Sequence, residues 1–417
     1  MPIEIGIYCV YLPIIIRKFM NKLIQQFQSH LLSVDLTFKR YLWNDVDWDN
    51  RLIAITGARG VGKTTLILQY IKENFKTEIE NVLYVSLDNL YFSKTTLTDF
   101  ASEFVKHGGK YLFLDEVHKY PNWSVEIKNI YDNFPELSIV FTGSSALDIL
   151  KGKADLSRRI VTYKMNGLSF REFLEFKYHR VFPIYSLKDI TENATEISHL
   201  INSTIKPIKL FEEYLKTGYY PYFIGDEKNY YQRIEQTINQ IIENDLLIIE
   251  HIDFTSINNL RKLLIIIAEI VPFKPNVLKL SKQIGINRDT FVKYLHWLAR
   301  ADLLLLLETD TYGISKLNKP EKVYLNNPNL VYALTESVPN IGTIRETFFY
   351  NQLNVKYKVR YTDKGDFLID NSFIFEIGGK NKKNKQIEGL KNAFIAADNI
   401  EFAYKNTLPV WLFGFLY

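Results

Sequence analysis

One short segment limits the fold of this chain more than any other. It is Gly57-Ala-Arg-Gly-Val-Gly-Lys-Thr64, three glycines followed by a lysine and a threonine. An apolar, β-branched run precedes it over 51–56, and residues 64–74 follow with apolar side chains at helical spacing. Glycines let successive backbone N–H groups point at one anion, and a helix start adds its positive dipole end. The segment therefore predicts a strand, a glycine-rich anion-binding turn and a helix.

The same segment satisfies the pattern G-x-x-x-x-G-K-[ST] of phosphate-binding loops in full. In that pattern Lys63 reaches the β- and γ-phosphates, and the hydroxyl of Thr64 ligates Mg²⁺. We therefore predict that ATP and Mg²⁺ bind here. The residues expected around the phosphates are Gly57, Ala58, Arg59, Gly60, Val61, Gly62, Lys63, Thr64 and Thr65.

Another apolar run, 111–114, ends in two carboxylates, Asp115 and Glu116. Buried charge is costly unless it is paired or bound to a metal. Coupled to the loop upstream, Asp115 is expected to contact Mg²⁺. Glu116 is the expected general base that orients and deprotonates the attacking water.

A further apolar run, 138–142, leads to Ser144, which we expect beside the γ-phosphate, with Thr142 as second choice. Two arginines, Arg158 and Arg159, precede another β-like run. One interpretation is an arginine finger that acts on the nucleotide of a neighbouring subunit. The other is an ordinary surface pair of basic residues. Asp88, after the run 82–87, is interpreted either as a solvated turn residue, which is favoured, or as a hydrogen-bonding group near the site.

Length and composition set the wider frame. A chain of 417 residues predicts two to four domains, and a net charge of +4 neither demands nor excludes a nucleic-acid partner. The single cysteine, Cys9, excludes an intrachain disulfide and favours a reducing, cytoplasmic location. No stretch is long and apolar enough to span a membrane. Residues 1–19 are interpreted either as preceding a true start at Met20 or as a short packing or membrane-surface segment.

The motifs together resemble the prokaryotic AAA-type ATPases with an AAA_14-like core, whose ATPase core is followed by a domain labelled DUF4143. The likeness rests on the glycine-rich loop, Leu114-Asp-Glu116, Thr142-Gly-Ser-Ser145, Asp155–Arg159 and Gly167–Leu174. Leu215–Pro221 looks like a further family element, with Tyr219 in place of a second glycine. In the family the arginine follows a glycine, so Arg159 is the better candidate for the finger.

The resemblance covers residues 36 to 390 and implies the fold class. It is an α/β P-loop NTPase of AAA+ type with a parallel sheet in the order 5-1-4-3-2. A helical and winged-helix region and a restriction-endonuclease-like α/β domain follow. The expected parts are an N-terminal extension over 1–35, the ATPase core over 36–175, a helical lid or linker over 176–272, a winged helix over 273–335 and the nuclease-like domain over 336–417.

Residues 278–307 read as a helix closed by Gly285, a second helix over 288–299 and an apolar strand. That order is the winged-helix layout, whose second helix often enters the DNA major groove. In that case four basic residues are expected to contact DNA phosphates: Lys282, Arg288, Lys293 and Arg300. The alternative is that the module only packs on the ATPase core.

The last domain is predicted to have a helix with Glu346, strands over 357–361, 366–370 and 373–377, a helix over 386–397 and a final strand over 410–415. Glu346, Asp366 and Glu376 fit the acid positions of a restriction-endonuclease-like site. The matching lysine position holds Gly378, and Lys380 lies four residues from Glu376, about 13 Å along a strand. A degenerate site is favoured, without excluding Mg²⁺ binding and cleavage.

Three functions follow from these residues. The first is a Mg²⁺-dependent AAA+ type ATPase that couples hydrolysis to conformational change in its C-terminal modules. The second is an ATP-gated DNA-binding protein or nuclease, and the third is a nucleotide-stabilised interaction scaffold. Homo-oligomers and an unknown protein partner are compatible with all three.

Overall fold

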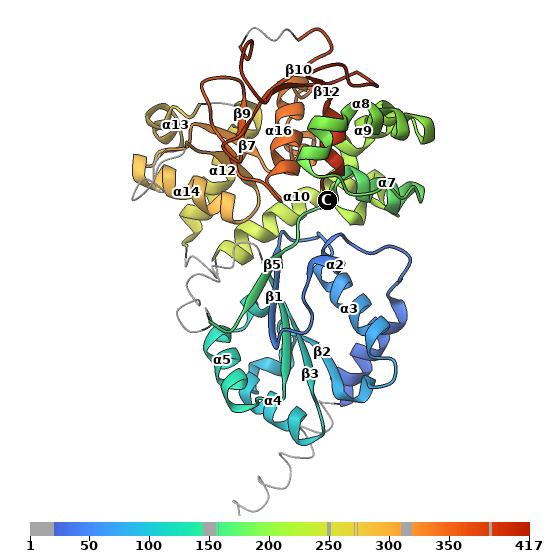
Figure 1. The fold of residues 1–417 in the computed structure, drawn as a ribbon. Coiled ribbons are helices and arrows are strands. Elements are labelled where there is room, and N and C mark those ends of the chain that lie inside the picture. The colour runs from blue at the N-terminus through green and yellow to red at the C-terminus, as the bar shows by residue number, and fades with distance from the viewer. Residues whose placement is uncertain are drawn as a thin grey trace, which may run out of the picture. The chain divides into compact units, whose positions relative to one another are not determined.

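The computed structural model describes residues 21–144, 156, 158–247, 252–270, 272, 274–309, 319–382 and 386–417. The alternative start at Met20 lies outside these residues. The chain forms two compact units, drawn in Figure 1. The first unit runs to Gly57 and resumes over Gly62–Met165, and the second comprises Ala58–Val61 and Asn166–Tyr417.

A five-stranded parallel sheet forms the centre of the first unit. Its order is β2-β3-β4-β1-β5, which confirms the predicted order 5-1-4-3-2. The strands are β1 (Leu52–Gly57), β2 (Val82–Ser86), β3 (Tyr111–Asp115), β4 (Ser138–Ser144) and β5 (Val161–Lys164). Every residue of β1 is buried, as expected for a central parallel strand covered on both faces.

Helices between the strands cover the sheet, and in Figure 1 α3 and α5 flank it on opposite sides. The apolar faces of α3 and α4 explain their place: Leu66, Ile67 and Phe100 are all at most 1% exposed. Thr96 caps α4 by accepting a hydrogen bond from the backbone N–H of Asp99. The helices are one over residues 21–33, α2 (Leu42–Asp45), α3 (Lys63–Asn74), α4 (Leu97–Lys106) and α5 (Trp123–Asn133).

The second unit begins with a helical region. A capping box at Ser169 and Glu172 starts α7. A π-helix, Ile241–Asp245, continues directly from α10. The other helices are α7 (Phe170–Tyr178), α8 (Leu187–Thr204), α9 (Pro207–Thr217), α10 (Tyr230–Gln240) and α12 (Phe254–Ile270).

Buried asparagines hold the segment after α9, which contains the predicted family element. Asn329 is 1% exposed, and its Oδ1 accepts hydrogen bonds from the backbone N–H of Tyr219 (2.8 Å) and the hydroxyl of Tyr230 (2.5 Å). Its Nδ2 donates to the carbonyl of Leu215 at 2.8 Å. These hydrogen bonds hold the segment around Tyr219 in one conformation, because a buried polar group that loses its hydrogen-bond partner destabilises the fold.

The region 277–325 contains two helices and an antiparallel strand pair. They are α13 (Val277–Ile284), α14 (Arg288–Arg300), β6 (Leu304–Leu307) and β7 (Lys322–Leu325). Gly285 ends α13 with φ of 82°, as its position in the sequence predicts. The helices and the first strand are where we expected them, and the assignment to the winged-helix class stays a prediction.

The C-terminal sheet has the order β12-β11-β10-β9-β8. Its strands are β8 (Val359–Arg360), β9 (Phe367–Ile369), β10 (Phe373–Gly378), β11 (Ala393–Ala397) and β12 (Thr407–Pro409). Helices α15 (Pro328–Leu334) and α16 (Ile341–Leu353) precede it. Asp370 and Asn371, in the tight turn between β9 and β10, both have left-handed φ, 47° and 56°.

Two predicted elements of this region are wrong. Residues 386–397 do not form a helix: 393–397 is strand β11, paired in parallel with β10 and β12. Its alanines favour a helix locally, but burial and two strand partners outweigh that preference. Val410–Phe415 is a 3₁₀-helix, not a strand. The run is apolar throughout, and such a run has no periodicity that separates a buried strand from a buried helix.

Candidate functional site

The glycine-rich loop joins the carboxyl end of β1 to the first turn of α3. Gly62 precedes the helix with φ of 99°, a conformation that glycine adopts at little cost. A Cβ on Gly57 would lie 2.1 Å from the carbonyl oxygen of Met165, so that position has no room for a side chain. Lys63 is 8% exposed, and its ammonium donates to the carbonyl of Gly57 at 2.9 Å. The side chain of Lys63 thus folds back and binds the first residue of the loop.

The tip of the loop, Ala58–Val61, groups with the second unit. There the guanidinium of Arg59 lies 3.3 Å from a carboxylate oxygen of Asp245, whose side chain is 2% exposed. Gly60 has φ of 82°, and a Cβ on it would meet the ring of Tyr222 at 2.6 Å. Ala58 and Val61 are buried, and Thr65 is exposed in the first turn of α3.

Asp115 is the centre of a hydroxyl cluster at the carboxyl edge of the sheet. Its carboxylate accepts hydrogen bonds from Thr64 Oγ1 and from the hydroxyl of Tyr84, both at 2.7 Å. The hydroxyl of Thr142 also donates to it. Asp115 is 4% exposed, and burial with the charge of Asp115 raises the pKa of Tyr84 well above its ordinary range. The structure therefore brings three of the expected residues, Thr64, Asp115 and Thr142, together.

Glu116 follows β3 with φ of 56°, a left-handed conformation that is uncommon for a residue other than glycine. Its backbone N–H donates to the hydroxyl of Thr142 at 3.1 Å. Its carboxylate lies 2.9 Å from the ammonium of Lys119 and 4.0 Å from the imidazole of His118. The backbone conformation and the ion pair together fix the position of this carboxylate.

Ser144 and Arg159 lie on β4 and just before β5. Ser144 is 5% exposed, and its backbone N–H donates to the imidazole Nδ1 of His118 at 3.4 Å. Arg159 forms two bonds to Asp132 on α5, Nε to Oδ1 at 2.9 Å and Nη2 to Oδ2 at 3.2 Å. In this chain the candidate finger is thus paired with an acid of the same unit.

Sequence reasoning missed Tyr84, His118 and Lys119 at this edge. The signal for Tyr84 is its strand: β2 pairs with β3 in a register that puts Ser86 opposite Asp115. Lys119 lies three residues after Glu116 on a short 3₁₀-helix, close enough for an ion pair. Both relations become visible only with the strand order and the turn after β3.

The predicted C-terminal acids form a second cluster, in which lysines take part. Lys322 on β7 lies 3.4 Å from Glu346 and 3.3 Å from Asp366. Lys382 lies 2.5 Å from Glu376, whose side chain is 2% exposed. Lys380 is exposed, so the ammonium beside Glu376 is that of Lys382.

A glycine makes this last contact possible. A Cβ on Gly378 would lie 2.5 Å from the side chain of Lys382, which therefore fills the space that a side chain at 378 would take. Burial and the charge of Asp366 raise the pKa of Glu346, and burial raises that of Glu376. In the described part of the chain no group of three or more His, Cys, Asp or Glu side chains is arranged to hold a metal ion.

The four basic residues expected to contact DNA are all exposed on α13 and α14. The ammonium of Lys293 lies 4.5 Å from the ring centre of Trp297. Tyr294 and Trp297 are 3% and 6% exposed, so these aromatics contribute to the core of the module. Over the residues that the structure describes, none of the helices has the length and apolar character needed to cross a membrane.

Comparisons with known families agree with the fold of the first unit. The model of an AAA domain (AAA_14) matches residues 49–174. That match and the sheet order show that the chain contains a P-loop AAA-type ATPase core. Residues 208–340 match a domain of unknown function, DUF8612. The likeness to DUF4143 is not confirmed.

One relative and two solved structures give the wider context. An uncharacterized protein of Methanocaldococcus jannaschii, MJ1637, is 26% identical over 406 residues, or 90% of this chain and 84% of that protein. AMPPCP-bound DnaA from Aquifex aeolicus is 15% identical, with a TM-score of 0.25 over 62% of this chain and 83% of its own. C. elegans PCH-2 is also 15% identical, with a TM-score of 0.23 over 43% of this chain and 48% of its own. Similarity at such TM-scores carries no functional information.

Proposed function

We propose that this protein is a Mg²⁺-dependent ATPase of the AAA+ type. The observation that carries the proposal is the hydrogen bond from Thr64 on the loop to Asp115 on β3, at 2.7 Å. It joins the segment expected to hold phosphates to the carboxylate expected to hold the metal. The matching AAA domain supports the same assignment.

The residues present fit both groups. A hydroxyl and a carboxylate are the oxygen ligands that Mg²⁺ prefers, and Thr64 and Asp115 supply them next to the loop. The loop N–H groups and the ammonium of Lys63 would hold the phosphates, with Lys63 exchanging the carbonyl of Gly57 for a phosphate oxygen. Bound Mg²⁺ would neutralise charge that develops on the phosphate oxygens.

Four other residues of the first unit have proposed roles in hydrolysis. Glu116 would orient the attacking water and accept its proton, while Thr142 fixes the backbone beside it. Ser144 would contact the γ-phosphate from the end of β4. Arg159 would act on the nucleotide of a neighbouring copy only after it leaves Asp132.

Two substitutions test the assignment. Lys63→Ala should abolish ATP binding, measured by fluorescence of a labelled nucleotide. Glu116→Gln keeps the size of the side chain and should bind ATP, while phosphate release falls about 100-fold or more, where 100-fold is the lower end of the range for a general base. Glu80→Gln, a change at an exposed acid of the same unit, serves as control. Wild-type turnover by Glu116→Gln would remove Glu116 from the mechanism.

We further propose that hydrolysis is coupled to the second unit through the tip of the loop. Arg59 and Gly60 contact Asp245 and Tyr222 within that unit, and a change of the tip on phosphate binding would alter both contacts. Asp245→Asn should change the ATP affinity while Asp226→Asn, an acid of the same unit outside this contact, should not. Equal affinities in the two variants would contradict the coupling.

Possible partners of the coupled modules are DNA, a second copy of the chain or another protein. Hydrolysis rates measured with and without duplex DNA, on protein sized by light scattering, separate these. Stimulation that falls steeply with salt would favour DNA contact through the exposed bases of α13 and α14. ATP binding without phosphate release under every condition would favour the nucleotide-stabilised scaffold.

A second candidate function is cleavage of a phosphodiester by the C-terminal cluster. The observation in its favour is Lys382, which occupies the space beside Gly378 and reaches Glu376. Against it, Lys322 lies between Glu346 and Asp366, where a metal would be needed. Incubation of the full chain with plasmid and Mg²⁺ or Mn²⁺ tests this. Absence of nicking by wild type with every metal would exclude it.

A further inference from the structure

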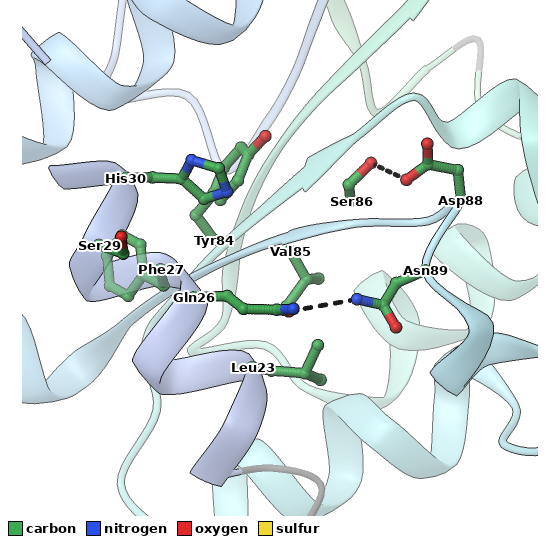
Figure 2. A pocket seen from close by; sticks show the side chains of 10 residues that line it. All are labelled: Leu23, Gln26, Phe27, Ser29, His30, Tyr84, Val85, Ser86, Asp88 and Asn89. Carbon is green, nitrogen blue, oxygen red and sulfur yellow. Dashed lines mark hydrogen bonds between the residues drawn. The ribbon is translucent and has the colours of Figure 1, made fainter. Parts of the chain in front are cut away.

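A pocket of about 430 Å³ lies in the first unit between the helix over 21–33 and the carboxyl end of β2. Figure 2 shows its two walls: Leu23, Gln26, Phe27 and His30 face the residues of β2 and of the turn after it. Small-molecule sites commonly have volumes of about 300–1,000 Å³ and mix apolar walls with a few polar groups. This pocket has both properties.

Two residues of the lining connect the pocket with the two carboxylates of the proposed hydrolysis site, Asp115 and Glu116. Tyr84 lines the pocket, and its hydroxyl donates to Asp115 at 2.7 Å. Asp88 also lines it and lies 3.5 Å from the ammonium of Lys119, which is in turn 2.9 Å from Glu116. A ligand in the pocket would therefore contact Tyr84, which donates to Asp115, and Asp88, which is linked to Glu116 through Lys119.

The hydrogen-bonding groups of the pocket favour a ligand that donates. Three donors on its lining are already engaged: Ser86 donates to Asp88 at 2.6 Å, Asn89 to Gln26 at 3.2 Å and Tyr84 to Asp115. Asp88 is a carboxylate with about four lone-pair sites, and its side chain is 48% exposed. Burial alone would raise the pKa of Asp88, but the hydrogen bond from Ser86 and the charge of Lys119 hold it below the ordinary value.

Aromatic rings complete the recognition surface. The rings of Phe27 and His30 both lie beside Tyr84, with centroids 6.4 Å and 5.9 Å from it. Aromatic faces attract cations through the ring quadrupole. The lining thus combines a carboxylate, Asp88, with an aromatic wall, and this combination suits a compact organic cation better than an anion or a sugar.

We propose that this pocket binds a small organic cation, an amine or a guanidinium compound, and that the bound cation slows hydrolysis through Asp88 and Lys119. A cation on Asp88 neutralises one of the two carboxylates that attract Lys119. The ammonium of Lys119 then pairs more strongly with Glu116 and keeps that base from the attacking water. The effect on rate rests on the proposed ATPase function, whereas binding does not.

Calorimetry of the full chain without nucleotide tests binding. The probe is agmatine, a guanidinium amine, and N-butylacetamide is its uncharged counterpart. Wild type and Glu80→Gln should bind agmatine equally, Asp88→Asn about tenfold more weakly, and Ser29→Trp, which adds a bulky side chain to the lining of the pocket, not at all. N-butylacetamide should give no heat. No heat from agmatine with wild type, or equal binding by Asp88→Asn, would overturn the proposal.

Turnover tests the regulation. Saturating agmatine should lower kcat of wild type about fivefold or more, within the usual range of coupling between two sites, and leave Asp88→Asn unchanged. Bound agmatine with unchanged kcat would overturn the regulatory part. If no ATPase activity is found, coupling is read from the agmatine affinity with and without Mg²⁺ and AMPPNP, because linkage is reciprocal. If agmatine binds with different affinity in the presence and absence of nucleotide, the coupling between the pocket and the nucleotide site is supported even though the proposed ATPase function fails. Equal agmatine affinities under the two conditions would overturn the coupling.

Discussion

The hydroxyl of Thr64 lies 2.7 Å from Oδ2 of Asp115 and donates a hydrogen bond to it. The two residues are 51 positions apart in the sequence: Thr64 lies at the start of α3, and Asp115 is the last residue of β3. The hydroxyl of Tyr84 shares the same oxygen at 2.7 Å. Asp115 is thus oriented by side chains from three different segments.

Removing the tyrosine hydroxyl should weaken the metal site without breaking the fold. In Tyr84→Phe the ring stays and one donor to Asp115 is lost, and partners that orient metal ligands typically contribute about 10- to 100-fold in metal affinity. We expect the Mg²⁺ concentration for half-maximal turnover to rise within that range. Tyr111→Phe, at the start of β3, is the matched control. An unchanged Mg²⁺ dependence in Tyr84→Phe would show that this hydroxyl does not support the metal site.

Alanine substitutions at two glycines with similar backbone angles should distinguish backbone strain from an effect on ATP binding. Gly60 has φ of 82° and lies against Tyr222, whereas Gly225 has φ of 92° with nothing within 4 Å of a Cβ. Alanine at either position should cost about 1–2 kcal/mol of stability for the left-handed conformation. Only Gly60→Ala should also lower ATP affinity, measured by nucleotide titration. Equal ATP affinities for the two variants would mean that the tip of the loop tolerates a side chain.

The C-terminal cluster should bind a metal only when its lysine is removed. In Lys322→Met the carboxylates of Glu346 and Asp366 lose the ammonium between them, which destabilises the variant. Mn²⁺ should then raise its melting temperature, because a ligand that binds only the native state stabilises it. Wild type and Lys364→Met, a change at an exposed lysine nearby, should not respond. A metal response of wild type would contradict the view that Lys322 fills this site.

The same cluster predicts a pH dependence of stability. The pKa of Glu346 is raised from its ordinary value of 4.5, first by burial and then by Asp366. The native state therefore binds this proton more tightly than the unfolded state, and wild type loses stability as pH rises from about 4.5 through the folded pKa. Glu346→Gln is uncharged and should gain stability relative to wild type over that interval, measured by urea unfolding at several pH values. A difference that stays constant with pH would show that Glu346 does not titrate in this window.

Substitution of Asn329 should strongly lower the stability of the second unit. Asn329→Ala leaves the hydroxyl of Tyr230, the N–H of Tyr219 and two carbonyls without their partners in a buried site. Each unsatisfied buried group costs about 1–3 kcal/mol, so a loss of about 3 kcal/mol or more is expected in urea unfolding. Asn239→Ala, at an exposed position on α10, should change stability little. Similar stabilities of the two variants would show that water replaces these bonds.

The sequence predicted the ATPase core well because its signals are local. Strand, loop and helix around Lys63 follow from periodicity and glycine spacing, and the acids after β3 follow from the end of an apolar run. Tyr84 was missed because its contact with Asp115 depends on the register between β2 and β3, and no local pattern encodes that register. In the C-terminal sheet, Ala393–Ala397 and Val410–Phe415 were wrong because tertiary burial, and not local preference, decides their structure.

The left-handed backbone of Glu116 has a consequence for how this position can vary in evolution. The proposed role of a general base requires a carboxylate at this position, and the backbone conformation requires a residue that tolerates φ of 56°. Asp, Asn and Gly adopt such angles readily, whereas β-branched residues are strongly disfavoured. Relatives that have lost hydrolysis should therefore carry Asn, Gln, Asp or Gly at this position far more often than Val, Ile or Thr. The geometry of one peptide unit thus restricts which residues can replace Glu116.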